Sequence, residues 1–271
     1  IIYLYKGAKM EKVSVVLADW QVLFREGIHF TLSGEEGIEV IGEVTNSEEA
    51  LNFIEKNPPS VAILNADRGE LSGIDVTSRI KQNLPSVSVI LIMDSDNEEQ
   101  LFSAMKCGAS ACLTKDIDPL DLVNIIKKVA QGASPISEAL LRPGIASRVV
   151  DEFETFSLIS KEVNNLLARL SPRESEILGH LADGSSIEQV SQALDINEEA
   201  ARHHLDLILT KLVANDHNRE VIEAAQSHLP SIVSRARQAG KLEADYITKE
   251  EFTEFKESLR ERFKSLSGEL G

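Results

Sequence analysis

Five short runs of apolar, mostly β-branched residues alternate with amphipathic segments along the first half of the chain. The runs are VSVVLAD from Val13, IEVIGEV, SVAILNA, VSVILIM and ASACLTK. Runs this short and this uniformly apolar are typical of strands that are buried on both faces, as in parallel sheets covered by helices. The alternation of strand and helix therefore predicts an α/β fold, a doubly wound five-stranded parallel sheet.

Composition narrows the class of protein. The chain has 271 residues, with 28 Lys or Arg and 44 Asp or Glu, so its formal net charge is −16. Such acidity argues against a protein that coats nucleic acid non-specifically. The apolar runs are too short to span a membrane, and the first residues lack the pattern of a signal peptide, so we expect a cytoplasmic protein with no membrane contact. Cys107 and Cys112 are too few for a disulfide framework and have no partners for a zinc site, so we expect no metal and no cofactor.

The sequence predicts five consecutive parts. The first precedes Met10, which resembles a natural start, and is treated as an upstream extension. The others differ in the type of secondary structure that their apolar residues favour. They are the extension (1–9), the α/β domain (10–132), a linker with a connecting helix (133–169), an all-α domain (170–229) and an amphipathic helical extension (230–271).

The all-α domain carries helix start and stop signals at short intervals. Ser171, with Pro172 and Glu174 behind it, predicts an N-cap with a capping box, and Gly184 predicts the end of that helix. Ser185 with Glu188 predicts a second capping box.

A third helix is predicted to begin after Asn197 and to run through Leu212, and a fourth to run through REVIEAAQSHL. A helix, a short turn and a second helix of these lengths form a helix-turn-helix, whose second helix enters the major groove of DNA.

Ligands of doubly wound sheets bind beyond the carboxyl ends of the strands. The residues expected there are Asp19 and Trp20 after the first strand, Asn65 at the end of the third, Met93 and Asp94 at the end of the fourth and Lys115 at the end of the fifth. Five of them form the candidate site of the α/β domain: Asp19, Trp20, Asn65, Met93 and Lys115.

The order and spacing of these residues resemble the receiver domain of bacterial response regulators of the NarL/FixJ type, which has a flavodoxin-like fold. The text that carries the resemblance is ADWQVLFREG, VAILNADRGELSG and GASACLTKD. In the second domain, LSPRESEIL followed by EAARHHLDLILTKL resembles the LuxR-type DNA-binding domain. The resemblance covers roughly residues 12–228 and implies a two-component transcription regulator that binds double-stranded DNA.

The resemblance also implies a phosphorylation site, which this chain carries in altered form. In the family, two acids after the first strand and an aspartate after the third hold Mg²⁺, and the third-strand aspartate accepts a phosphoryl group. Here Asp19 keeps one acid, while Trp20 replaces its neighbour and Asn65 stands at the phosphoacceptor position. Met93 replaces the hydroxyl residue of the fourth strand, and Lys115 is retained. The pattern predicts a degenerate pocket.

The altered residues lack the chemical groups that aspartyl phosphorylation requires. A carboxamide is not a carboxylate nucleophile, Mg²⁺ prefers several hard oxygen ligands, and a thioether cannot donate a hydrogen bond to a phosphoryl group. We therefore expect no aspartyl phosphorylation, in a register supported by Gly73, eight residues after Asn65. Three questions stay open: whether Lys115 neutralises Asp19, whether Trp20 fills the pocket or lies on the surface, and whether Asp67 is a substitute acceptor or a solvated turn acid.

The groove-facing positions of the third helix are expected to contact DNA. By the resemblance they are Arg202, His203, Asp206 and Thr210, with Lys211 near the helix end. Arg202 is the best candidate for a base or phosphate contact, whereas Asp206 departs from the basic or amide residues usual in the family. Residues 165–225 contain five basic and eleven acidic residues, which predicts weak non-specific binding.

The C-terminal extension has a single apolar stripe, formed by Phe252, Phe255, Leu259, Phe263 and Leu266. It packs on the body of the chain or serves self-association or a protein partner. The leading functional interpretation is a homodimeric DNA-binding transcription regulator that acts without aspartyl phosphorylation. The alternative is a protein-interaction or scaffold module that has lost both phosphorylation and DNA binding. An enzyme is not expected, because the sequence has no activated nucleophile, metal cluster or glycine-rich phosphate loop.

Overall fold

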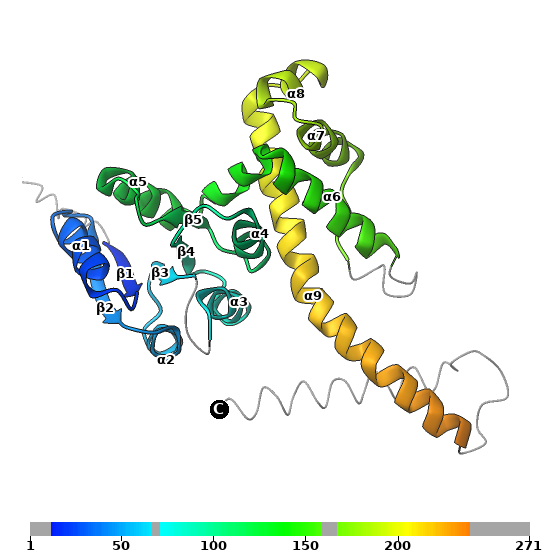
Figure 1. Ribbon diagram of the computed structural model, residues 1–271, viewed down its shortest axis with the longest axis horizontal. Coiled ribbons are helices and arrows are strands. Elements are labelled where there is room, and N and C mark those ends of the chain that lie inside the picture. Colours follow the sequence, from blue (N-terminus) through cyan, green and yellow to red (C-terminus); the bar gives the residue numbers. More distant parts are fainter. Residues whose placement is uncertain (1–11, 67–70, 159–166, 239–271) are drawn as a thin grey trace, which may run out of the picture. The chain divides into compact units, whose positions relative to one another are not determined.

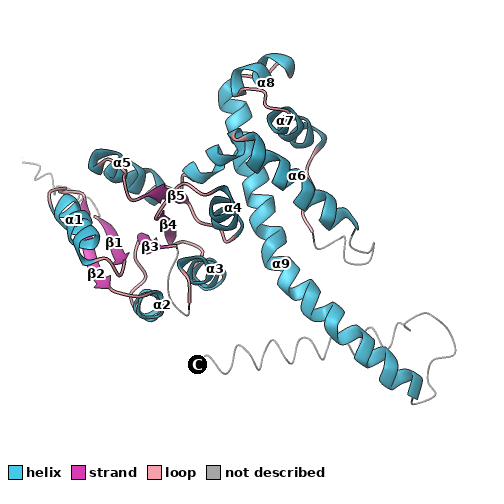
Figure 2. Cartoon of the chain, viewed as in Figure 1, coloured by secondary structure: helices cyan, strands magenta, loops and turns pink. Residues whose placement is uncertain are grey.

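The computed structural model describes residues 12–66, 71–158 and 167–238 (Figure 1). All five predicted strands are present, and they form one parallel sheet in the order β2-β1-β3-β4-β5 (Figure 2). The predicted doubly wound sheet is therefore confirmed. The strands are β1 (Val13–Ala18), β2 (Ile38–Val44), β3 (Val61–Asn65), β4 (Ser88–Met93) and β5 (Ala111–Thr114).

Helices cover both faces of the sheet. Alternate strand residues point to opposite faces, so Leu17 and Ile63 pack on one side while Val16 and Leu64 pack on the other. The first side is covered by α1 (Val22–Ser33) and α5 (Pro119–Ala130). The second side is covered by α2 (Ser47–Lys56), α3 (Gly73–Asn83) and α4 (Glu98–Lys106).

The segment predicted as a linker is packed over most of its described length. It forms a 3-10 helix, η1 (Pro135–Leu141), and then α6 (Pro143–Leu158). Ile136, Leu140, Ile145 and Val149 are buried in the apolar cluster that also contains α4, and the Ile136 amide donates to the Ser110 carbonyl oxygen at 3.1 Å. The connecting helix is thus part of the core rather than a free tether. Residues 159–166 lie outside the described residues.

The helical domain begins as the sequence predicts. The Ser171 hydroxyl accepts a hydrogen bond from the Glu174 amide at 3.3 Å, and Glu174 accepts from the Ser171 amide at 2.6 Å, which is the expected capping box of α7 (Pro172–Ala182). Gly184 has a φ of 88°, a conformation that favours glycine, and it follows the end of α7.

The second capping box lies one residue later than predicted. Ser186 and Gln189 form it at the start of α8 (Ile187–Ala193), in place of Ser185 and Glu188. The reason is that the Ser185 amide is used in the turn that closes α7, where it donates to the His180 carbonyl oxygen at 2.9 Å.

A single helix, α9 (Glu198–Gln238), replaces the predicted third and fourth helices. The stretch VANDHN after Leu212 contains neither glycine nor proline, so no residue there interrupts the backbone hydrogen bonds. The apolar stripe of residues 252–266 falls outside the described residues. No helix in the described part of the chain is both long enough and apolar enough to cross a membrane.

Candidate functional site

Three of the five candidate site residues, Asp19, Asn65 and Lys115, come together at the carboxyl edge of the sheet. Because β1 pairs with β3, Asp19 lies beside Asn65, and the Asn65 Nδ2 donates to Asp19 Oδ2 at 2.9 Å. The Lys115 Nζ lies 3.9 Å from the same oxygen. Met93 is only 2% exposed, and its thioether is buried in the core on the side of the sheet that α2, α3 and α4 cover.

Both oxygens of the Asp19 carboxylate are already used. Oδ1 accepts the Gln21 amide at 2.6 Å, while Oδ2 accepts the Asn65 amide group, and the residue is 6% exposed. The Arg25 guanidinium donates to the Asp19 carbonyl oxygen at 2.7 Å and thereby fixes the start of α1. A buried carboxylate is stable only when it is paired in this way. Asp19 is therefore held as part of an internal network.

Lys115 has a closer partner than Asp19. Its Nζ lies 2.5 Å from Asp94 Oδ1, so the ion pair with Asp94 is the closer of the two. Asp94 was expected at the end of the fourth strand but was not assigned to the pocket, and the structure pairs it with Lys115.

Trp20 lies at the surface rather than in the pocket. It is 42% exposed, and the Lys115 Nζ stands 5.7 Å from the centre of its ring and 5.6 Å from that of Phe24. These are distances at which a cation and an aromatic ring attract.

This arrangement does not fit a divalent cation. A bound Mg²⁺ needs a near-octahedral set of oxygen ligands, usually with several waters. Here both oxygens of the Asp19 carboxylate accept hydrogen bonds, Asp94 is paired with the Lys115 ammonium, and Asn65 presents its NH₂ group.

Gly73 is required by close packing against the end of β3. A Cβ atom at this position would lie 2.1 Å from the Asn65 carbonyl oxygen, well inside the van der Waals limit. Only glycine allows α3 to begin this close to the strand. Asp67, the suggested substitute acceptor, lies outside the described residues.

The first turns of α9 have the N-cap and the buried apolar face that the sequence predicts. Asn197 caps the helix, since its Oδ1 accepts the Ala200 amide at 2.7 Å. His203, Asp206 and Thr210 are exposed on the outer face, and the Thr210 hydroxyl donates to the Asp206 carbonyl oxygen at 2.8 Å. The opposite face is buried through Ala201, Leu205, Ile208, Leu209 and Leu212.

Both cations of this helix segment are engaged inside the molecule. The Arg202 guanidinium is bonded to Glu138 of η1. The Lys211 Nζ donates to the two carboxylate oxygens of Glu174 at 2.9 and 2.6 Å. Burial of Glu174 opposes its ionisation, but the hydrogen bonds from Lys211 and Ser171 outweigh it and lower the pKa of Glu174 below its usual value. The outward charge on the helix is therefore acidic.

Two further contacts hold α9, and sequence reasoning missed both. The side chain of Asn215, which is fully buried, accepts the Ala168 amide at 2.7 Å and donates to the Ala168 carbonyl oxygen at 2.9 Å. Lys106 of α4 lies between Glu152 of α6, at 2.7 Å, and Asp216 of α9, at 3.0 Å. Burial lowers the pKa of Lys106, but hydrogen bonds to the two acids outweigh it and raise the pKa above its ordinary value. The sequence carries no signal for these pairs, because the partners are far apart along the chain.

Comparison with known proteins matches two separate parts of the chain to two families. Residues 15–127 match the response regulator receiver domain, and residues 168–224 match the bacterial regulatory proteins of the luxR family. The transcriptional regulatory protein DegU of Brevibacillus brevis is 32% identical over 222 residues, which cover 80% of this chain and 94% of DegU. The nitrate/nitrite response regulator NarL of Escherichia coli K12 is 27% identical over 205 residues, covering 76% of this chain and 91% of NarL. The solved receiver domain of NarL from Mycobacterium tuberculosis is 31% identical, covers 45% of this chain and 98% of that domain, and has a TM-score of 0.44.

Proposed function

This chain belongs to the DNA-binding response regulators of the NarL and DegU type, and we propose that it regulates transcription without phosphorylation of an aspartate. The observation that carries the proposal is the hydrogen bond from Asn65 Nδ2 to Asp19 at 2.9 Å. It places a non-nucleophilic carboxamide where the family has its acceptor and uses that carboxamide to satisfy the remaining acid. Lys115, held by Asp94, completes a pocket whose charges need no phosphoryl group.

Phosphoryl transfer is the direct test. The full-length protein is incubated with acetyl phosphate and Mg²⁺ and its intact mass is measured, with a receiver that retains the aspartate as positive control. We expect no added phosphoryl group. Stoichiometric labelling of any receiver aspartate would contradict the proposal.

Asn65→Asp tests whether the acceptor alone is missing. We expect little labelling of this variant, because Trp20 still replaces the second metal-binding acid and Met93 still lacks a hydroxyl. Efficient labelling would show that the pocket needs only its nucleophile and that the substitution of Trp20 matters less than we propose.

We further propose that α9 reads DNA through the face that carries Arg202, His203, Asp206 and Thr210. Its cap and its buried face support this role, and Arg202 lies at a position from which it can exchange Glu138 for a base or a phosphate. Selection of bound DNA from a random pool by the full-length protein tests it. Asp206→Lys should then tighten binding to the selected site and steepen its salt dependence by about one phosphate contact.

A homodimer is the assembly we propose for the regulator. On α1 the side chains of Leu23 and Phe30 are 89% and 83% exposed and lie two turns apart, and Leu120 at the start of α5 is 71% exposed. Large apolar groups grouped in this way favour burial against another surface. Sedimentation velocity of the full chain and of Leu23→Glu/Phe30→Glu would measure the assembly. A monomeric parent protein at tens of micromolar contradicts the dimer, and an unchanged dimer in the variant places its interface elsewhere, with the C-terminal extension as the next candidate.

The acidic outer surface of α8 and α9 favours a second candidate function, a protein-interaction module without DNA binding. The exposed acids on this surface outnumber the basic groups, and Arg202 is already paired. Failure to select any DNA site at low salt would favour this function over the first. The acids are Glu188, Asp195, Glu198, Glu199 and Asp206.

A further inference from the structure

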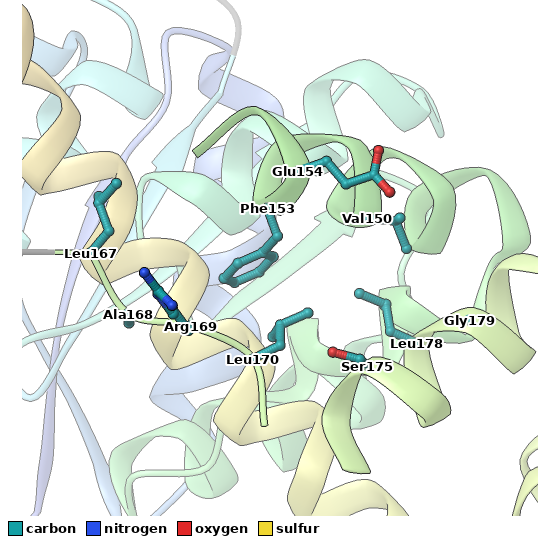
Figure 3. Close-up of a pocket in the computed structure, with 10 residues that line it drawn as sticks. All are labelled: Val150, Phe153, Glu154, Leu167, Ala168, Arg169, Leu170, Ser175, Leu178 and Gly179. Atoms are coloured by element: carbon teal, nitrogen blue, oxygen red, sulfur yellow. The ribbon is translucent and has the colours of Figure 1, made fainter. Parts of the chain in front are cut away.

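A hollow between α6 and α7 lies away from both sites. It has a volume of about 530 Å³ and is bounded on a third side by residues 167–170 (Figure 3). Pockets that hold small organic molecules fall between roughly 300 and 1,000 Å³. The hollow is therefore large enough for a compact metabolite-sized ligand.

Its wall is mostly apolar. Val150 and Phe153 of α6 face Leu170 and Leu178 across the hollow, and these four labelled side chains converge on one space (Figure 3). Apolar walls with a few polar groups at the edge are typical of sites that bury the hydrocarbon part of a ligand. The apolar body of a ligand would replace water here.

Gly179 of α7 lines the hollow and has no side chain to fill it. A Cβ atom at Gly179 would meet no other heavy atom within 4 Å, so close packing does not require glycine there. Glycine inside a helix costs about 1 kcal/mol relative to alanine. The chain thus carries a helix-destabilising residue at a position of α7 that lines the hollow and where a side chain would narrow it. This supports an occupant other than the protein itself.

Arg169 supplies the charge at the edge. It lines the hollow and is exposed, and its guanidinium has no hydrogen-bond or ion-pair partner among the described residues. Glu154, the acid on the opposite edge, already has an interaction of its own. Arg169 is the basic group that lines the hollow, and a guanidinium is well suited to carboxylate and phosphate groups.

We propose that this hollow binds a small organic anion, with its hydrocarbon part among Val150, Phe153, Leu170 and Leu178 and its anionic group on Arg169. Such a ligand would join α6 to α7 directly. It would also contact the segment around Ala168, whose backbone forms two hydrogen bonds with the Asn215 side chain of α9. The site is independent of the proposed function of the sheet edge and would give the regulator a small-molecule input.

Octanoate and 1-octanol serve as matched probes, because they share a chain and differ in charge. Isothermal titration calorimetry of the full-length protein should give saturable binding of both, with octanoate preferred. Arg169→Gln should reduce the affinity for octanoate about tenfold and leave that for octanol unchanged. Gly179→Leu should reduce the affinity for both by about tenfold or more, and Gly179→Ala should reduce it less.

Gly27→Leu on α1 is the control, because its Cβ also meets nothing within 4 Å and Gly27 lies outside the hollow. It should change neither affinity, and circular dichroism would verify that each variant is folded. Absence of saturable binding for both probes overturns the proposal. So does binding that Gly179→Leu leaves intact, and an equal loss of both probes in Arg169→Gln overturns the anionic assignment.

Discussion

The charged groups at the edge of the sheet and on the outer face of α9 are both paired within the molecule, but the two pairings differ in kind. At the sheet edge the residues themselves have changed, since Asn65 and Met93 cannot do the chemistry of an acceptor and a hydroxyl. On α9 the cation is still present, but Arg202 is bonded to Glu138. The first change is permanent, whereas the second is an exchangeable pairing.

Burial separates the two cases energetically. Asp19 is 6% exposed, so its hydrogen bonds cannot be replaced by water. The side chains of Arg202 and Glu138 are 41% and 52% exposed, and surface ion pairs contribute about 0–1 kcal/mol. A DNA phosphate or base could therefore replace Glu138 at little cost to the fold.

The largest effect on stability is expected at the sheet edge. Asn65→Leu removes the donor to Asp19 and leaves a buried carboxylate oxygen unsatisfied, which should lower the free energy of unfolding by about 2–3 kcal/mol. Urea denaturation measures it, with Asn124→Leu on the exposed face of α5 as the control for the same change. Equal stability of the two variants would mean that the pocket is not a structural network.

Arg202→Ala tests the other half of the comparison. Binding to a selected DNA site should weaken by about 1–3 kcal/mol, with specificity relaxed at one position if Arg202 contacts a base. Arg142→Ala is the control, because Arg142 is likewise an exposed arginine paired with an acid, Asp96. Electrophoretic shifts at several salt concentrations give the affinities, and identical losses in both variants would remove Arg202 from the groove.

Lys211→Met tests the ion pair between Lys211 of α9 and Glu174. Because Glu174 is 2% exposed, neither water nor DNA can replace Lys211 as its partner. We expect a loss of about 1–2 kcal/mol in the free energy of unfolding at neutral pH. The pKa of Glu174 is lowered in the folded protein, so this contribution is present above its unfolded pKa and is lost as the pH falls through its folded pKa. The parent protein and the variant should therefore converge in stability at acid pH, and a constant difference down to that pH would contradict the assignment.

The smallest effect on stability is expected for Glu138→Gln. Removing this exposed acid should change the free energy of unfolding by less than about 0.5 kcal/mol, yet it should tighten DNA binding because Arg202 is released. Thermal denaturation and DNA titration are measured on the same preparation. A large loss of stability with unchanged DNA affinity would make the Arg202–Glu138 pair structural, like the sheet edge.

The sequence was sufficient where local signals decide the structure. Apolar runs located all five strands, Asn197 and Ser171 were found as caps from their spacing, and the strand ends identified Asp19, Asn65 and Lys115. These features depend on neighbours within a few residues or on the shared edge of a parallel sheet.

It was insufficient where partners come from distant segments. Nothing local pairs Arg202 with Glu138, which is 64 residues earlier, or Asn215 with Ala168, which is 47 residues earlier. The surface position of Trp20 was likewise left open, because its contact with Lys115 depends on how β1 and β5 are placed. The shift of the second cap from Ser185 to Ser186 was decided by a competing backbone hydrogen bond.

The apolar cluster that contains η1 and α6 has a consequence for unfolding. It includes Leu91 of β4 and Leu140 of η1 together with Leu178 of α7 and Leu209 of α9, all in one connected group of buried side chains. Because η1 and α6 contribute side chains to this cluster, they cannot unfold without exposing the residues of β4, α7 and α9 that pack against them. Denaturation should therefore be a single cooperative transition for the receiver and the helix-turn-helix, and the slowest-exchanging amides of β4 and α7 should share one opening free energy.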